Sequence, residues 1–341
     1  MKELTLRKIA EACHGTVAPE AETVTVTGVQ SDSRRVRPGD LFVAIKGEKA
    51  DGHDFVAMAA SLGAKAALVA RPVEAPIPTI LVADTIRAYG DLAAAYREHA
   101  GITVIGITGS VGKTTTKEMT ACLLARSFHT ARTEGNHNNN LGLPMTILDM
   151  PDDTEVAVLE MGMNHFREMA YLSSIGRPDI AVIVNIGTAH IEFLGSQAGI
   201  RQAKMEVVEG MPENGTLLLN GDDRMLRELS QTPRQRIVYF GSDEGCQVRC
   251  REIVNALDGL RFRVTHGENS FSVIMNLEGR HFVSDAMAAV AVGLELGASE
   301  EKIRQGLRTF RNLAGRQETL RAYGYTLIKD CYNAGPESMA A

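Results

Sequence analysis

One short segment constrains the fold of this chain more than any other. Residues 108–116 read TGSVGKTTT, and they lie directly between an apolar run at 102–107 and a helical pattern at 114–125. Gly109 and Gly112 allow the backbone to wrap closely around an anion, and the start of a helix offers unpaired N–H groups. A strand, a glycine-rich loop and a helix in this order predict a phosphate-binding loop in an α/β sheet.

The loop departs from the strict pattern G-x-x-x-x-G-K-[ST], because Ile107 stands five positions before Gly112. In such loops the lysine, here Lys113, meets the β- and γ-phosphates, and the next residue, Thr114, can ligate Mg²⁺. The alternative is an ordinary glycine-rich turn with a solvated lysine. Because a strand precedes the loop and a helix follows it, phosphate binding is the favoured interpretation.

Further strand–helix units surround this loop. Apolar runs at 102–107, 156–159, 180–186 and 217–219 are each followed by a helical pattern, which predicts a mostly parallel, doubly wound sheet. Between 248 and 275 the apolar period changes to two, which indicates an antiparallel edge. Two helices are expected after this edge, at about 284–296 and 299–310.

The residues before and after this sheet show patterns of two further α/β domains. Residues 1–100 alternate short strands and helices and form a small domain, whereas residues 101–312 hold the phosphate loop. After residue 312 the pattern starts again with a strand near 325–329. Pro336-Glu337-Ser338 then resembles the opening of a helix. Residues 313–341 are therefore expected to begin a third domain.

The composition excludes several classes of protein. The chain has 341 residues, with 44% hydrophobic and 23% charged residues and a net charge of -6, which argues against a disordered chain and against a dedicated nucleic-acid binder. Five scattered cysteines without a C-x-x-C pair fit a reducing compartment. The N-terminus does not resemble a signal peptide, and no apolar run is long enough to cross a bilayer. We therefore expect a cytoplasmic protein without a membrane span.

Two polar side chains follow neighbouring predicted strands. The run at 156–159 leads to Glu160, and the run at 180–186 leads to His190 a few residues later. Ligands of doubly wound sheets bind outside the carboxyl ends of the strands, so both residues are candidates for the site beside the phosphate loop. A carboxylate oxygen there suits Mg²⁺. Each residue taken alone is more often a solvated or structural side chain.

Lys204 is selected by its spacing. Ile200, Ala203, Val207, Val208 and Met211 lie on one face of a predicted helix at 200–211, and Lys204 falls inside that apolar stripe. A lysine on a buried face is costly unless it is paired, snorkels to the edge or is chemically altered. Without further context, snorkelling is the simpler interpretation.

Two polar clusters would ordinarily be interpreted as turns. One is the loop at 135–140, with Asn136, Asn138 and Asn139. The other is the cluster Ser31, Asp32, Ser33 and Arg34.

Taken together, these residues resemble the Mur ligases, the ATP-dependent enzymes that add amino acids to the peptidoglycan precursor. The resemblance covers essentially the whole chain. It is carried by SDSRRVRPGDLFVAIKGEKADGHDF (31–55), TGSVGKTTTKE (108–118), GNHNNNLGLPMTIL (135–148), LEMGMNHFREM (159–169), RPDIAVIVNIGTAHIEFLGS (177–196) and AKMEVVEG (203–210).

Within the family, the loop at 135–140 and the segment at 159–169 are closest to ligases that join D-alanyl-D-alanine to UDP-N-acetylmuramoyl-tripeptide. By resemblance, Ser31 to Arg34 lie near the uridine site, and Asn136, Asn138 and Asn139 belong to the substrate site. The same family pattern assigns an ATP contact to Thr108, Gly109, Ser110, Val111, Gly112, Lys113, Thr114, Thr115, Asp285 and Asn333.

The resemblance also implies two Mg²⁺ sites. Thr114 and Glu160 would hold the first ion, whereas His190 and a carbamylated Lys204 would hold the second. Lys113, Glu160, His190, Lys204, Arg316 and Asp330 would serve catalysis, with Tyr332 mapping beside them. The implied reaction forms an acyl phosphate on the tripeptide carboxylate, which the dipeptide amine then attacks. The enzyme is expected to be a monomer.

Two features depart from the family pattern. Phe282 and Asp285 stand where asparagines are usual, and the family's third domain runs well beyond residue 341, which implies a truncated third domain. Other hypotheses are a non-catalytic protein that binds nucleotide and the UDP precursor, or a Mur-type ligase for another amino acid. A folylpolyglutamate-synthase relative would lack the cluster at 31–34, and a plain phosphotransferase would explain neither Lys204 nor the first hundred residues.

Overall fold

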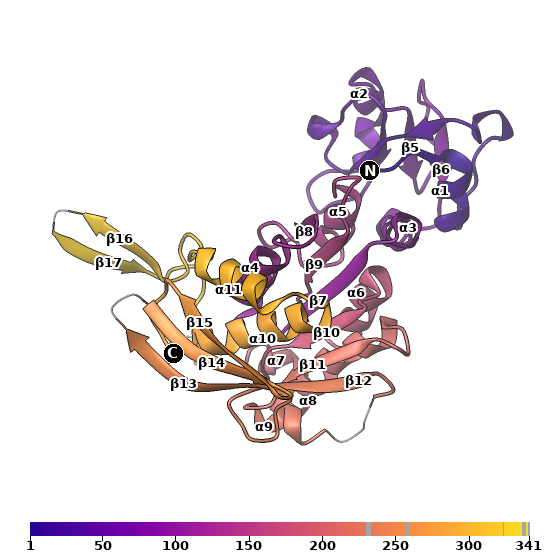
Figure 1. Cartoon of the computed structure of the whole chain (residues 1–341). Helices are drawn as coiled ribbons and strands as arrows, with labels where there is room; N and C mark the ends of the chain where they lie inside the picture. Colours follow the sequence, from indigo (N-terminus) through magenta and orange to yellow (C-terminus); the bar gives the residue numbers. More distant parts are fainter. Residues whose placement is uncertain (230–232, 257–258, 323, 336–338, 340–341) are drawn as a thin grey trace. The chain divides into compact units, whose positions relative to one another are not determined.

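The computed structural model describes residues 1–229, 233–256, 259–322, 324–335 and 339. They form a mixed α/β protein of two compact units (Figure 1). The first unit comprises Met1–Ile102 and Thr133–Thr154, and the second comprises Thr103–Arg132 and Glu155–Ala341. Residues 133–154 thus pack with the first unit although they interrupt the second in sequence, which the predicted boundaries did not anticipate. The division at 1–100, 101–312 and 313–341 stays a prediction.

A four-stranded parallel sheet forms the centre of the first unit, in the order β3-β4-β5-β6. Its middle strands are fully buried and, apart from Asp40 at the start of β4, apolar, as expected for a parallel sheet covered by other elements. The strands of this sheet are β3 (Gly28–Gln30), β4 (Asp40–Val43), β5 (Ala66–Val69) and β6 (Thr79–Leu81), whereas β1 (Leu4–Thr5) and β2 (Thr25–Val26) form a separate antiparallel pair. The helices are α1 (Leu6–Ala12), α2 (Val56–Ser61), α3 (Thr85–Ala100) and α5 (Gly142–Leu148), with 3-10 turns η1 (Pro19–Ala21), η2 (Ser33–Arg35) and η3 (Gly52–Phe55).

The second unit is built on a nine-stranded sheet in the order β15-β14-β13-β12-β11-β10-β7-β9-β8. The strands from β8 to β12 are parallel to their neighbours, whereas β13, β14 and β15 pair antiparallel, as the change of period predicts. The bounds are β7 (Thr103–Thr108), β8 (Thr130–Arg132), β9 (Val156–Glu160), β10 (Ile180–Ile183), β11 (Thr216–Asn220), β12 (Arg236–Gly241), β13 (Val248–Ala256), β14 (Gly259–His266) and β15 (Asn269–Met275).

Helices of the second unit carry much of its core. They are α4 (Lys113–Leu124), α6 (Glu168–Gly176), α7 (Ile191–Leu194), α8 (Gln197–Met205), η4 (Glu206–Gly210), α9 (Arg224–Arg227), α10 (Phe282–Glu295) and α11 (Glu300–Thr309). Both α10 and α11 pack against α4. A Cβ on Gly306 would lie 2.5 Å from the Cα of Leu123, so glycine is what allows α11 to approach α4 so closely.

The predicted helix at 200–211 is wrong in its second half. The α-helix ends at Met205, and Glu206–Gly210 continues as a 3-10 turn. Tightening of this kind is common at a helix C-terminus, and here Gly210 and Pro212 prevent further α-helix. Ile200 and Ala203 are buried as the stripe predicts, and Lys204 is buried with them, so the simpler interpretation of a lysine that snorkels to the edge is wrong.

A hairpin follows the second unit's helices in sequence. Strands β16 (Glu318–Ala322) and β17 (Tyr325–Lys329) pair antiparallel, and β17 coincides with the strand expected at 325–329. The helix opening expected at residues 336–338 lies outside the described residues. Among the helices that the structure describes, none is both long and apolar enough to cross a membrane.

Candidate active site

The phosphate loop lies at the carboxyl end of the central strand β7. This strand is flanked by β9 and β10, with Ile107 opposite Glu160 and Thr108 opposite Ile183. Three strand ends therefore meet at one edge of the parallel sheet, which is where ligands of such sheets bind. This convergence places Glu160, at the end of β9, at the same edge of the sheet as the phosphate loop.

Gly112 connects the loop to helix α4. Its φ of +81° is a left-handed conformation that favours glycine, and the first α-helical hydrogen bond runs from Thr116 N to Gly112 O at 2.9 Å. The N–H groups of the first turn, including those of Lys113, Thr114 and Thr115, therefore have no acceptor within the helix. The partial positive charge of the helix N-terminus adds to this, so the loop is suited to an anion.

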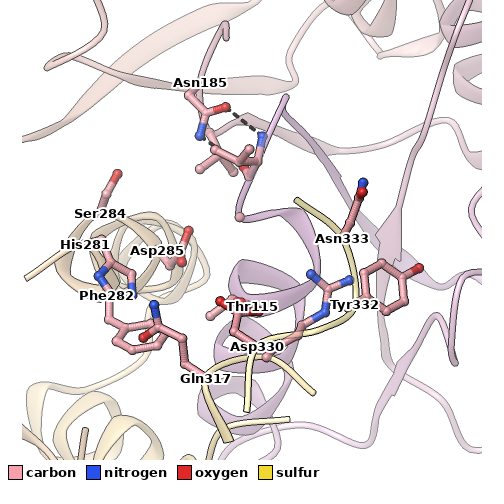
Figure 2. A pocket seen from close by; sticks show the side chains of 14 residues that line it. Thr115, Asn185, His281, Phe282, Ser284, Asp285, Gln317, Asp330, Tyr332 and Asn333 are labelled. Atoms are coloured by element: carbon pink, nitrogen blue, oxygen red, sulfur yellow. Dashed lines mark hydrogen bonds between the residues drawn. The ribbon is translucent and has the colours of Figure 1, made fainter. Parts of the chain in front are cut away.

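Asn185 holds the other half of the loop. Its Oδ1 accepts hydrogen bonds from Ser110 N and Val111 N, both at 3.0 Å. Its Nδ2 donates to Val111 O at 3.0 Å, and Figure 2 shows Asn185 with its bonds to the loop residue Val111. Asn185 was not among the residues predicted from the sequence. The signal was available, because Asn185 follows the apolar run of β10 just as Glu160 ends that of β9.

Lys113 folds back over the loop that precedes it. Its Nζ donates to Gly109 O at 2.8 Å and to Ser110 O at 3.3 Å. Burial lowers the pKa of this amine, the charge of Glu160 opposes that shift, and the charge of Arg316 adds to it. The charges of Glu160 and Arg316 therefore both act on the lysine, as expected for members of one site.

Glu160, His190 and Lys204 are each coupled electrostatically to Lys113. Glu160 is the last residue of β9 and is 3% exposed, and Lys204 on α8 is 2% exposed. Burial places the pKa of Lys204 well below its usual value, and the charge of Lys113 adds to this shift. The pKa of His190 is lowered first by burial and then by the charges of Lys204 and Lys113. These shifts favour a neutral amine and a neutral imidazole.

No group of three or more His, Cys, Asp or Glu side chains arranged to hold a metal occurs among the described residues. The predicted metal ligands Thr114, Glu160, His190 and Lys204 include only two residues of those types. Their assignment to metal ions therefore stays a prediction.

A cavity of about 300 Å³ lies beside the loop (Figure 2). It is lined by the loop, the start of α10 and the segment around the hairpin, and its predicted members are Val111, Gly112, Thr115, Asp285, Arg316, Asp330, Tyr332 and Asn333. His281 and Gln317 also line it and were not predicted. The guanidinium of Arg316 lies 3.9 Å from the ring centroid of Tyr332, a cation–π contact that orients the arginine.

The cluster Ser31 to Arg34 belongs to the first unit. Asp32 caps the turn η2 by accepting from Arg34 N, and it also pairs with the Arg34 side chain at 2.9 and 2.7 Å. This hydrogen bonding lowers the pKa of Asp32 to about 2, although the pair is largely exposed. The turn geometry agrees with the simple interpretation of the cluster, and the uridine role stays a prediction.

The asparagine loop belongs to the first unit as well. Asn139 caps α5, because its Oδ1 accepts from Leu141 N at 3.2 Å and from Gly142 N at 2.8 Å, whereas Asn138 N donates to Asn136 O at 2.7 Å. Helix α5 packs on β3, the strand that leads into residues 31–34. Both polar clusters are thus attached to the same small sheet.

The parallel sheet, the loop at the end of its central strand and the lysine over that loop define a phosphate-loop, nucleotide-binding α/β protein. Comparison with known families makes the class more specific. The family described as "Mur ligase middle domain" matches residues 107–293, and "Mur ligase family, catalytic domain" matches residues 25–107. The chain belongs to the Mur ligase family.

Individual relatives agree with this assignment. The UDP-N-acetylmuramoyl-tripeptide–D-alanyl-D-alanine ligase of Bacillus subtilis (strain 168) is 39% identical over 100% of this chain and 75% of its own length. The enzyme of the same name from Escherichia coli (strain K12) is 36% identical over 100% and 76%. The chain thus spans about three quarters of the length of these two relatives.

Solved structures give the same result. A crystal structure of MurF from Acinetobacter baumannii superposes with a TM-score of 0.92 at 37% identity, over 100% of this chain and 76% of that one. MurF from Thermotoga maritima in complex with ADP gives a TM-score of 0.84 at 31% identity, over 92% and 73%. A folylpolyglutamate synthase from Thermotoga maritima, at 16% identity and a TM-score of 0.56, shares the fold alone.

Proposed function

We propose that this chain is an ATP-dependent carbon–nitrogen ligase that joins D-alanyl-D-alanine to UDP-N-acetylmuramoyl-tripeptide. The observation that carries the proposal is the similarity over the whole chain, at 39% and 36% identity, to enzymes with that name. The phosphate loop and the adjoining cavity supply the geometry for ATP, and a MurF relative has been crystallised with ADP.

In this proposal the loop and α4 bind the ATP phosphates. The N–H groups of the first turn and the ammonium of Lys113 neutralise the phosphate charge, and Arg316 adds a second cation. Thr108, Asp285 and Asn333 complete the nucleotide site. Thr108 supports it, because its buried Oγ1 has no hydrogen-bond partner among the described residues. A buried donor without a partner is costly until a ligand satisfies it.

The chemistry proceeds in two steps. An oxygen of the tripeptide carboxylate attacks the γ-phosphorus, the bond to the bridging oxygen breaks, and ADP leaves with that electron pair. The dipeptide amine then attacks the acyl carbon and loses a proton, and phosphate leaves with the former carboxylate oxygen. The protein's contribution is positioning and charge neutralisation, as in other phosphoryl transfers. Asp330 lines the nucleotide cavity and is assigned to the catalytic group by the family pattern.

The side chains around Lys113 suit divalent cations. Thr114 and Glu160 offer oxygen donors, which Mg²⁺ prefers, and the environment of His190 favours the neutral imidazole that binds metals. The lowered pKa of Lys204 favours the free amine, which is the form that reacts with carbon dioxide. We therefore assign the first ion to Thr114 and Glu160, and the second to His190 and carbamylated Lys204. Bound Mg²⁺ would neutralise phosphate charge. Rescue of Lys204→Ala by short-chain acids would test the carbamate role.

Substrate recognition is assigned to the first unit. Ser31, Asp32, Ser33 and Arg34 would contact the uridine end of the precursor, and Asn136, Asn138 and Asn139 would contact the substrate. Both clusters stay attached to one sheet, which supports a shared role. A cytoplasmic monomer is consistent with this soluble precursor chemistry.

The experiment that tests the proposal measures phosphate release from ATP. We expect release only when UDP-N-acetylmuramoyl-tripeptide and D-alanyl-D-alanine are both present, and loss of release in Lys113→Ala. Release with a single amino acid in place of the dipeptide would assign the chain to another Mur-type activity. Nucleotide binding without any turnover under saturating substrates would favour the non-catalytic alternative.

A further inference from the structure

Asp285 is a buried carboxylate in the wall of the nucleotide cavity. It lies in the first turn of α10, is 7% exposed, and lines the cavity together with Gly112 and Thr115 (Figure 2). A Cβ on Gly112 would lie 2.5 Å from its Oδ1, so the carboxylate sits against the residue that starts the phosphate-binding helix. An acidic group is unexpected at a site built for an anion.

The charged neighbours do not give this carboxylate a cation of its own. On α4, Thr116 Oγ1 donates to Asp285 Oδ1 at 2.9 Å, Lys113 is bonded to the loop carbonyls, and Lys117 pairs with Glu118 at 3.0 Å. The charged groups of the hairpin segment that line the cavity are Arg316 and Asp330, and His281, which directly precedes α10, is a further titratable residue of the lining.

Burial raises the pKa of Asp285 to about 7, and the Thr116 hydrogen bond opposes the rise only in part. Burial lowers the pKa of His281, which is partly offset by its hydrogen bond to Gln317 and by the charge of Asp330. Near neutral pH the imidazole is therefore expected to be uncharged. With a pKa of about 7, the carboxyl group of Asp285 is close to half protonated at neutral pH.

We propose that Asp285 accepts nucleotide phosphate beside it only as the neutral carboxylic acid, so that binding of ADP or ATP takes up a proton from solvent. This inference rests on the proposed nucleotide site. Repulsion between the carboxylate and the incoming phosphates favours the protonated form in the complex. The hydroxyl of the neutral acid is also a donor, which a carboxylate is not.

The sign of the pH dependence follows from this linkage. Because the complex holds the proton more tightly than the free protein, nucleotide affinity is highest below about pH 7. Above that pH the free protein has lost the proton, and affinity falls by up to about tenfold per pH unit until the pKa of the complex is reached.

The test is calorimetric titration of the whole chain with ADP from pH 6 to 9, in buffers of different ionisation enthalpy. The matched variant is Asp285→Asn, which keeps the size and the acceptor for Thr116 but cannot titrate. We expect the wild type to take up more than half a proton at pH 8 and the variant to take up none. The ratio of variant to wild-type affinity should rise at least fivefold between pH 6 and 8.

A second variant keeps the carboxylate. Thr116→Val removes the hydrogen bond that stabilises the charged form, so the loss of affinity should begin at a higher pH than in the wild type. Equal proton uptake in wild type and Asp285→Asn would overturn the inference and leave the nucleotide site intact. Failure of wild type and both variants to bind ADP at every pH would overturn the proposed function as well.

Discussion

Replacing Lys204 by methionine should make the protein more stable, although it removes a proposed catalytic residue. Lys204 is 2% exposed on α8, and burial holds its pKa well below the usual value. Methionine keeps the apolar stem that packs with Ile200 and Ala203 and removes the amine. The change therefore separates the cost of burying an ionisable group from the loss of packing.

The magnitude follows from proton linkage. An unfolded lysine has a pKa of about 10.4, and burial places the pKa of Lys204 well below its usual value in the folded state, so folding must remove the proton at a cost of about 1.36 kcal/mol for each pH unit between the two pKa values. We expect Lys204→Met to gain about 2–4 kcal/mol at pH 7. Since the unfolded chain binds a proton that the folded chain lacks, wild-type stability should rise by up to about 1.4 kcal/mol per pH unit toward pH 10.

The assay is urea denaturation followed by circular dichroism at pH 7, 8 and 9, in buffer free of carbon dioxide so that the amine stays unmodified. Lys302→Met on the exposed side of α11 is the matched control, for which we expect little change at any pH. The stability advantage of Lys204→Met should shrink as pH rises. Equal or lower stability with an unchanged pH slope would refute the reasoning, because the amine would then reach water or an anionic partner.

Two further predictions concern backbone and helix ends. Gly112→Ala should abolish ADP binding and lower the free energy of unfolding by about 1–3 kcal/mol, because it combines a φ of +81° with a Cβ 2.5 Å from Asp285 Oδ1. Gly101→Ala is the control, because Gly101 has a φ of +70° but open space around it, and it should cost only about 1 kcal/mol in urea denaturation. Glu206→Gln should cost about 1–2 kcal/mol, because that carboxylate accepts from Arg167 N at 2.9 and 2.8 Å and from Ala170 N at 3.3 Å. Glu209→Gln, which removes only an exposed ion pair, should cost under about 1 kcal/mol by the same measurement.

Local patterns predicted much of the second unit. The phosphate loop could be located because glycine spacing, a lysine and the change from strand to helix all occur within a few residues. Helical spacing placed Lys204 on the apolar face of its helix, but spacing alone could not decide between a buried amine and one that snorkels to the edge. The antiparallel strands β13 to β15 were indicated by their period of two.

Contacts between distant parts of the chain could not be predicted in this way. The hydrogen bond from Thr116 to Asp285 joins residues 169 positions apart, and the bonds of Asn185 to the loop span 74 and 75 positions. The packing of residues 133–154 with the first unit likewise depends on tertiary contacts. Resemblance supplied the names of Arg316 and Asp330, but the cavity that they line is visible only in three dimensions.

The transfer of a carboxylate oxygen to phosphate tests the ligase account most directly. The tripeptide carboxylate would be labelled with oxygen-18, and the phosphate released in the presence of ATP and D-alanyl-D-alanine would be examined by mass spectrometry. The account predicts one labelled oxygen in each phosphate, because the acyl carbon–oxygen bond breaks when the amine attacks. Phosphate without label, formed at the same rate as the peptide product, would contradict an acyl phosphate and with it the proposed mechanism.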